Sequence, residues 1–111
     1  DTIYLIDNEN SGTVVDKFYA AGAQYNANTT TTFEAKVNAS LVQTGAGEAT
    51  WFQHSGNTYI VIDGNDAVNP NPDAGKVDTY TAGKDTVIEI IGLKDLSTAS
   101  FNATEGTLEI A

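Results

Sequence analysis

The sequence predicts a mainly β fold, either a β-sandwich or a β-roll-capping sheet, with about six strands and one short α-helix. Thr50–Asp63 holds two runs of aromatic and β-branched residues around a Ser-Gly-Asn turn signal. Similar runs recur between turns rich in Gly, Asp and Asn, and a single stretch has convincing helical spacing. The 111 residues fit one domain with a modest core.

The predicted hairpin at Thr50–Asp63 is the expected centre of that core, and it contains the single Trp of the chain. A two-residue primed turn would join its strands, at either Ser55-Gly56 or Gly56-Asn57. This choice sets the register, so that Phe52 faces Tyr59 or Val61. Both faces of the second strand are apolar, which indicates an inner strand covered on both sides.

Two short strands are expected near the N-terminus, Thr2–Ile6 and Thr13–Phe18, separated by the turn cluster Asp7–Gly12. They are either antiparallel neighbours or successive rungs of a parallel coil. The chain starts on a strand, with Asp1 rather than Met and without a signal peptide. We therefore expect a single domain, residues 1–111, excised from the C-terminal part of a longer secreted chain.

The predicted helix spans about Thr32–Val42 and follows a small, polar loop at Ala20–Thr30. Thr31 and Glu34 have the spacing of a capping box, and Gly45 is a plausible stop. The apolar stripe that we expect to pack on the sheet consists of Phe33, Val37 and Leu41.

A long loop, Asp63–Gly83, follows the hairpin and contains both prolines, with room for a short strand at Val77–Thr81. Asp85–Ile91 is the next expected strand, and Gly92 closes it. Leu93–Ser97 has the composition of a turn or a single helical turn.

The last expected strand is Thr107–Ile110, which follows a Glu105-Gly106 turn signal. Between these turns, Phe101 is the expected core anchor, since a large aromatic side chain gains the most from burial.

The charge balance limits the possible partners. Fifteen acidic residues oppose five basic ones, all Lys, which gives a net charge of −10. Such a surface repels nucleic acid and anionic lipid and attracts divalent cations or basic partners. No apolar run reaches the ~18 residues that a membrane helix needs. We therefore expect no nucleic-acid binding and no membrane insertion.

The long loop is the first candidate for a calcium site, because calcium takes 6–8 oxygen ligands and loop carboxylates supply them. The alternative is a solvated loop, where Asp and Asn favour turns for backbone reasons alone. A second, weaker candidate is the Asp7-Asn8-Glu9-Asn10 turn. The candidate ligands of the first site are Asp63, Asn65, Asp66, Asp73, Asp78 and Asp85.

No catalytic residue is predicted. His54 is the single His, and the neighbouring Ser55 would point to the opposite face of a strand, so a nucleophile triad is not indicated. We interpret His54 as an exposed residue at a strand end. With one His and no Cys, zinc is not expected either.

Several segments in a fixed order resemble a family. They are Trp51-Phe52, the Gly56–Asp63 run, Asp85-Thr86-Val87 with Ile90 and Gly92, and the Asp95-Leu96-Ser97 turn. Together they resemble the C-terminal domains of RTX-type bacterial proteins exported by type I secretion, namely surface-layer proteins and adhesins. The end of serralysin-like proteases is also similar. The resemblance covers Phe33–Ala111, but the calcium-binding repeat Gly-Gly-x-Gly-x-Asp is absent.

The resemblance implies a non-catalytic structural and export module, secreted or at the bacterial cell surface. Its partner would be the type I secretion machinery, with capping of upstream repeats, self-association in a lattice and calcium-dependent assembly as further roles. The alternatives are the non-catalytic tail of a secreted RTX hydrolase, a protease or a lipase, and an extracellular binding module. The Thr/Asn/Ala-rich composition and the lack of Arg favour the surface-layer interpretation.

Overall fold

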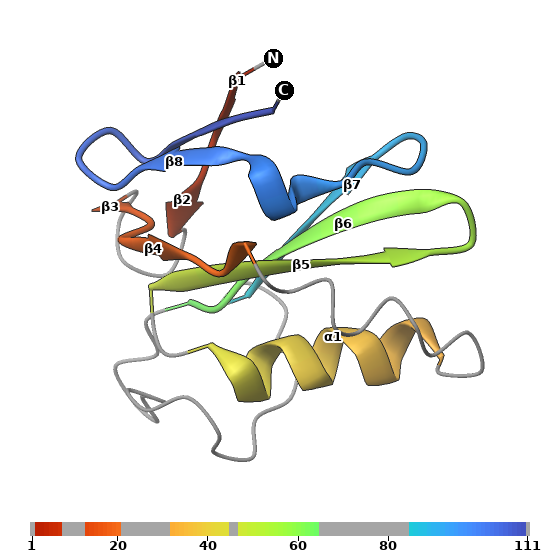
Figure 1. The fold of residues 1–111 in the computed structure, drawn as a ribbon. Helices are drawn as coiled ribbons and strands as arrows, with labels where there is room; N and C mark the ends of the chain where they lie inside the picture. The colour runs from red at the N-terminus through yellow and green to blue at the C-terminus, as the bar shows by residue number, and fades with distance from the viewer. Residues whose placement is uncertain (1, 8–12, 21–31, 45–46, 65–84, 111) are drawn as a thin grey trace.

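The computed structural model describes residues 2–7, 13–20, 32–44, 47–64 and 85–110. These residues form a mainly β fold with one α-helix, as predicted. Figure 1 shows three layers: α1 (Phe33–Gln43), a four-stranded sheet, and a three-stranded sheet on the side away from α1. The four-stranded sheet has the order β4 (Lys17–Phe18), β5 (Glu48–His54), β6 (Asn57–Ile62), β7 (Thr86–Ile90). The three-stranded sheet has the order β1 (Thr2–Tyr4), β9 (Thr107–Glu109), β8 (Ser100–Asn102).

Strands β5 and β6 form the predicted hairpin, and its turn is Ser55-Gly56. Both turn residues have positive φ, 48° and 85°, as a type I′ turn requires. This turn sets the register in which Phe52 faces Tyr59. Strand β6 pairs with β5 on one side and β7 on the other, so it is the inner strand that the sequence predicted.

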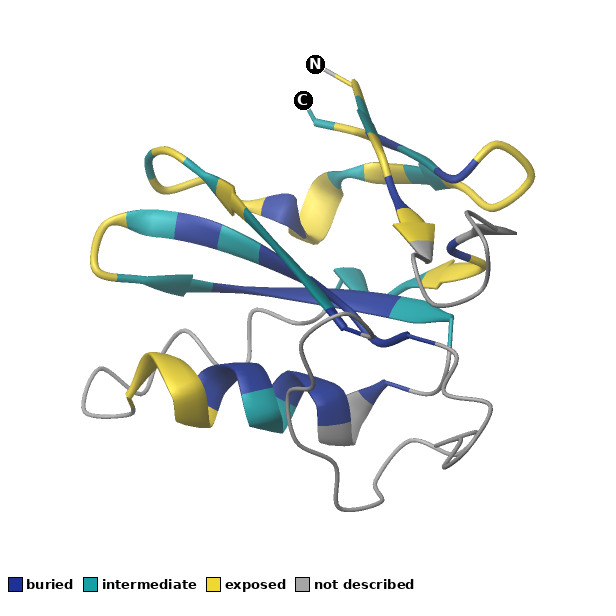
Figure 2. Ribbon diagram, turned by 180° about the vertical axis from the view of Figure 1, so that it is seen from behind, coloured by how far each residue is buried: buried dark blue, intermediate teal, exposed yellow. Residues whose placement is uncertain are grey.

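The two faces of the four-stranded sheet carry two separate apolar clusters, because alternate residues of each strand point to opposite faces. Toward the three-stranded sheet, Trp51 packs with residues of β6 and with Leu108 of β9. Toward α1, Phe52 and Val61 pack with the helix. Figure 2 shows the buried positions along β5, β6 and the sheet-facing side of α1. All three expected positions of the helix face the sheet: Val37 and Leu41 are buried, and Phe33, though 37% exposed, packs edge-on against the rings of Phe52 and Tyr59.

The N-terminal strands differ from the prediction because each one divides in two. The first gives β1 and β2 (Ile6–Asp7), and the second gives β3 (Thr13–Val14) and β4. The residues at the breaks, Leu5 and Val15, are fully buried in the core between the sheets. Strands β2 and β3 are antiparallel, which settles the open choice for this pair, and β4 then runs parallel to β5. These two divisions, and β8, which was not predicted, raise the count to nine strand segments within the described residues.

The N-cap of helix α1 lies one residue later than the predicted cap, Thr31. Thr32 is the N-cap, and its side chain accepts a hydrogen bond from the Ala35 backbone N–H at 3.2 Å. The capping box expected from Thr31 and Glu34 is therefore wrong. A box on Thr32 would need Glu or Gln three residues later, where the chain has Ala35. Thr44 is the C-cap, in extended conformation. The predicted stop at Gly45 lies outside the described residues.

Strands β7 and β9 lie within one residue of their predicted bounds. Gly92 ends β7 with φ 95°, a backbone conformation that favours glycine. Leu96–Thr98 is a short 3₁₀-helix, which decides between the two alternatives for Leu93–Ser97 in favour of a single helical turn. Phe101 is half-buried and packs against the core, with its ring 6.2 Å from that of Phe18. The loop Ala20–Thr30, beyond Ala20, and the strand at Val77–Thr81 lie outside the described residues.

No helix in the described part of the chain is long and apolar enough to cross a membrane.

We predict that Trp51→Ala destabilises the fold by about 3–5 kcal/mol, as truncation of a buried Trp usually does. Trp51 is 1% exposed, and its indole N–H donates to the Ala20 carbonyl at 2.8 Å. Denaturant unfolding followed by circular dichroism measures the change. Trp51→Phe, which keeps most of the apolar contact, is expected to cost less than Trp51→Ala. A loss under about 1 kcal/mol for Trp51→Ala would contradict the placement of the core.

Candidate functional site

Asp63 follows the last residue of β6, and its side chain is buried, with 2% exposure. Thr44 Oγ1 donates a hydrogen bond to Asp63 Oδ2 at 3.2 Å. The Asp63 backbone is also held, since its N–H donates to the Glu48 carbonyl and its carbonyl accepts from the Gly47 N–H, both at 2.8 Å. A buried carboxylate needs such partners because its desolvation is costly. Asp63 therefore ties the end of α1 to the end of β6.

Asp85 lies just before β7, and its side chain is also buried, with 8% exposure. Its Oδ1 accepts a hydrogen bond from the Gly64 backbone N–H at 3.0 Å. Because β6 and β7 are antiparallel neighbours, with Ile62 opposite Thr86, both aspartates lie at the same end of this strand pair. The two carboxylates thus flank the segment 65–84 where it leaves and rejoins the sheet.

Of the six predicted calcium ligands, the structure describes two, Asp63 and Asp85, and brings them to one end of the sheet. Both already take part in hydrogen bonds of the fold. Within the ranges that the structure describes, no three His, Asp or Glu side chains gather closely enough to hold a metal ion. Calcium binding stays a prediction. The other four ligands, Asn65, Asp66, Asp73 and Asp78, lie outside the described residues, as do Asn8, Glu9 and Asn10 of the weaker candidate.

His54 is the last residue of β5, as expected, but it is half-buried rather than exposed. Its ring lies edge-on to the Phe33 ring, with 5.6 Å between the centroids. Tyr59 completes this aromatic group, and its hydroxyl donates to Glu89 Oε2 at 2.8 Å. The bond to the Glu89 carboxylate raises the pKa of Tyr59. His54 therefore packs in an aromatic cluster that holds the start of α1 on the sheet.

The segments that carry the family resemblance meet at one joint, beside the start of β6. Asn57 Oδ1 accepts from the Gly92 backbone N–H at 2.9 Å. Thr58 Oγ1 accepts from the Lys94 N–H at 2.7 Å and donates to the Gly92 carbonyl at 2.9 Å. Gln53 adds a bond from Nε2 to the Lys94 carbonyl at 2.8 Å. The backbone N–H and carbonyl groups of the turn after β7 are thus hydrogen-bonded by side chains of the hairpin.

The Asp95-Leu96-Ser97 segment continues this joint into the core. Asp95 Oδ1 accepts hydrogen bonds from the Ser97 hydroxyl and from the Ser97 backbone N–H, the latter at 2.9 Å. These two bonds lower the pKa of the Asp95 carboxyl. Leu96, the residue between them, is fully buried against Trp51 and Leu108. The Asp-Leu-Ser pattern therefore caps a 3₁₀ turn that places one leucine in the core.

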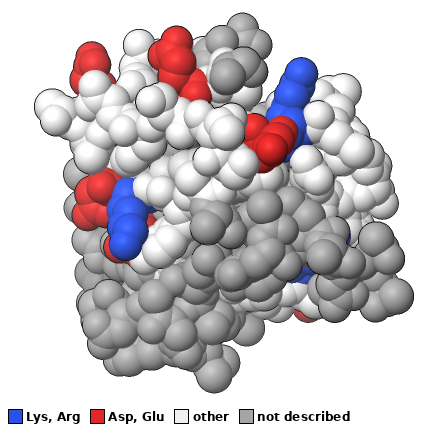
Figure 3. Space-filling model, viewed as in Figure 1, with Lys and Arg blue, Asp and Glu red and all other residues white. Residues whose placement is uncertain are grey.

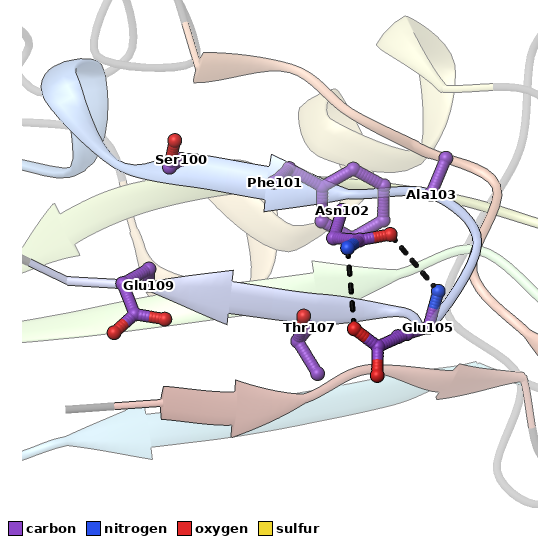
Figure 4. A pocket seen from close by; sticks show the side chains of 7 residues that line it. All are labelled: Ser100, Phe101, Asn102, Ala103, Glu105, Thr107 and Glu109. Atoms are coloured by element: carbon purple, nitrogen blue, oxygen red, sulfur yellow. Dashed lines mark hydrogen bonds between the residues drawn. The ribbon is translucent and has the colours of Figure 1, made fainter.

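A second feature is a hollow of about 640 Å³ on the outer face of the three-stranded sheet. Figure 4 shows its side chains, which come from β8, β9 and the turn that joins them. Apart from Phe101, which was expected as a core anchor, these residues were not predicted, because polar residues on short strands are also typical of a plain solvated face. The one pattern that could have indicated this face is the alternation of polar and apolar residues in Thr107–Glu109, in which Leu108 is buried and its two neighbours face the other side. The lining residues are Ser100, Phe101, Asn102, Ala103, Glu105, Thr107 and Glu109.

We predict that calcium stabilises the chain through the carboxylates of Asp63–Asp85. A ligand that binds only the folded state at a hundredfold excess over its dissociation constant adds about 2.7 kcal/mol. For a domain of this size, the melting midpoint should rise by roughly 10 °C. Melting curves are recorded with calcium, with magnesium at equal ionic strength, and with a chelator. Equal midpoints in all three would refute a calcium site here.

The variants for this test are Asp66→Ala, which should remove the calcium-dependent gain, and Asp95→Ala, which should keep it. Because Asp95 caps the 3₁₀ turn, its loss lowers the midpoint by itself. The quantity compared is therefore the gain on adding calcium, not the midpoint.

Thr58→Val tests whether the joint is structural. Thr58 is fully buried, and the isosteric change leaves the Lys94 N–H and the Gly92 carbonyl without their partner. We expect a loss of about 1–3 kcal/mol in the free energy of unfolding, measured with denaturant. Thr98→Val, at an exposed position, is the matched control and should change stability by less than about 0.5 kcal/mol. Equal effects of the two variants would contradict this role.

No protein-family model matches the chain, and no curated protein matches it. The resemblance to type I secreted proteins therefore rests on the motif residues alone, and the role that it implies is a proposal.

Proposed function

We propose that this chain is a non-catalytic structural and export module from the C-terminal part of a type I secreted bacterial protein of the surface-layer or adhesin type. The observation that carries the proposal is the joint at Asn57 and Thr58. Motif segments more than thirty residues apart in sequence bond directly to one another there. The polar groups of the motif are thus used to build the fold, which is what a structural module requires.

The topology also supports export in an unfolded state. Strand β1 pairs with β9, so residues 2–4 contact residues 107–109, at opposite ends of the chain. The three-stranded sheet cannot form before β9 has been synthesised. Pairings this distant in sequence slow folding. A transporter that reads the C-terminal segment before it folds would gain time from such a topology.

The edges of the three-stranded sheet support the capping role. Within the described residues, β1 pairs on one side only, with β9. An unpaired strand edge is a template for a further strand. β-Structured repeats placed before this domain would therefore meet an edge on which their sheet can continue.

The surface charge fits a location outside the cell, where calcium is abundant. Figure 3 shows acidic side chains scattered over one face among neutral residues, with few lysines. With a net charge of −10, copies of the domain repel one another at low salt. A divalent cation reduces this repulsion, which supports calcium-dependent assembly in a lattice.

The test is export of a passenger. The chain is fused to the C-terminus of a cytoplasmic protein and expressed with a type I transporter from a bacterium that secretes a surface-layer protein. We expect the fusion in the medium and a fusion lacking residues 65–111 in the cells, because the resemblance places the signal at this end. Immunoblots of medium and cells measure the distribution, with a cytoplasmic enzyme as the lysis control.

Trp51→Ala in the same fusion tests whether export depends on the export signal or on the folded domain. Since the signal is read before folding, this variant should be exported at least as well as the parent fusion. Retention of the intact fusion, or equal export of the truncated one, would overturn the proposal.

A further inference from the structure

The outer face of the three-stranded sheet carries two rows of side chains, each crossing all three strands. The pairing places Thr2, Glu109 and Ser100 in one row. It places Tyr4, Thr107 and Asn102 in the other. The residues between them, Ile3, Leu108 and Phe101, pack against the core, so the two rows face solvent. Directly opposed residues have Cβ atoms about 5 Å apart, which makes each row a continuous surface.

Tyr4 is the large aromatic side chain of this face, and it is 68% exposed. It stands on β1 directly opposite Thr107 of β9, and Thr107 is one of the residues that line the hollow. Exposing a Tyr to this extent forgoes the gain from burying its ring. The face of the ring has a partial negative charge, which attracts polarised C–H bonds laid against it.

The polar groups around the hollow can both donate and accept. The hydroxyls of Ser100 and Thr107 bond to no other residue in the described part of the chain. Glu109 accepts one bond from the Thr2 hydroxyl at 3.2 Å, and Glu105 one from Asn102 Nδ2 at 3.2 Å, shown as a dashed line in Figure 4. An ionised carboxylate has about four lone-pair sites, so each retains acceptors for a ligand.

Asn102 fixes the shape of the hollow at the β8–β9 turn. Its Oδ1 accepts from the backbone N–H groups of Thr104 and Glu105, at 2.9 and 3.1 Å. The Gly106 N–H then bonds to the Asn102 carbonyl at 2.7 Å. The Glu105 carboxylate is thus held by a turn that forms without ligand, and a preformed site loses less entropy on binding.

We propose that this face binds a neutral saccharide, with one sugar ring against Tyr4 and its hydroxyls on the hollow. A sugar hydroxyl both donates and accepts, which matches the carboxylates and the neighbouring hydroxyls of Ser100 and Thr107. Two neighbouring sugar hydroxyls can donate to the two oxygens of one carboxylate, Glu109 or Glu105. Anionic sugars are disfavoured because the described lining contains two Glu and no Lys. A second copy of this chain would meet the same repulsion.

The experiment is a titration of the ¹⁵N-labelled chain with maltose, cellobiose, lactose and N,N′-diacetylchitobiose, followed by NMR. We expect saturable shifts at Tyr4, Thr107 and Glu109 for at least one disaccharide, with a dissociation constant of the order of 1 mM, typical of a weak, specific ligand. A sulfated heparin disaccharide should bind more weakly. The proposal is overturned if none of the neutral disaccharides gives saturable shifts on this face, or if the sulfated one binds best.

Paired variants locate the site. Tyr4→Ala and Glu109→Gln should each weaken binding about tenfold, which corresponds to 1.4 kcal/mol. The matched controls are Ile91→Ala, at a side chain 75% exposed after β7, and Glu89→Gln, at an exposed carboxylate on the helix side of the other sheet. Equal losses in the controls would overturn the assignment. The inference is independent of the export role, since Tyr4→Ala should leave export of the passenger unchanged.

Discussion

The structure depends on the burial of one strand, β6, on both faces. Ile60 and Ile62 pack toward the three-stranded sheet, and Val61 packs toward α1. Because β6 also has hydrogen-bonded neighbours on both edges, it is enclosed on all four sides. Strands β5 and β7 pair with β6, β4 pairs with β5, and α1 and the three-stranded sheet pack on the two faces of β6. Strand β5 is also an inner strand, because it pairs with β4 and β6, and its Trp51 and Phe52 belong to the two apolar clusters.

The hydrogen bonds of the joint and of the loop ends are at opposite ends of β6. At its start, Thr58 holds the turn that follows β7. At its end, Asp63 and Asp85 hold the points where the segment 65–84 enters and leaves. Buried polar groups at both ends need fixed partners, and this requirement makes the register of the sheet unique. The same groups that resemble a secretion-family motif therefore specify the fold.

The two sheets differ in how far apart in sequence their paired strands lie and in whether their outer face is covered. The four-stranded sheet contains the long hairpin, with contacts close in sequence, and α1 covers it. The three-stranded sheet joins the two ends of the chain and keeps its outer face open. An open face formed by chain ends is free to present Tyr4 and the carboxylates of Glu105 and Glu109. The open outer face, on which the saccharide would bind, and the distant pairing of β1 with β9, which slows folding before export, thus both follow from one topology.

The sequence by itself determined the hairpin, the helix and the strand at residues 86–90, because their signals are local: a turn pair, a helical spacing, a run of β-branched residues. It also named Asp63 and Asp85 as candidate calcium ligands, because they lie at the two ends of a loop rich in Asp and Asn. Only the tertiary structure decided the breaks at Leu5 and Val15, where burial between two sheets outweighs strand continuity. The cap at Thr32 and the rows that place Tyr4 beside Thr107 were also beyond the sequence. These features depend on contacts between distant segments, and pairing partners a hundred residues apart leave no local pattern to read.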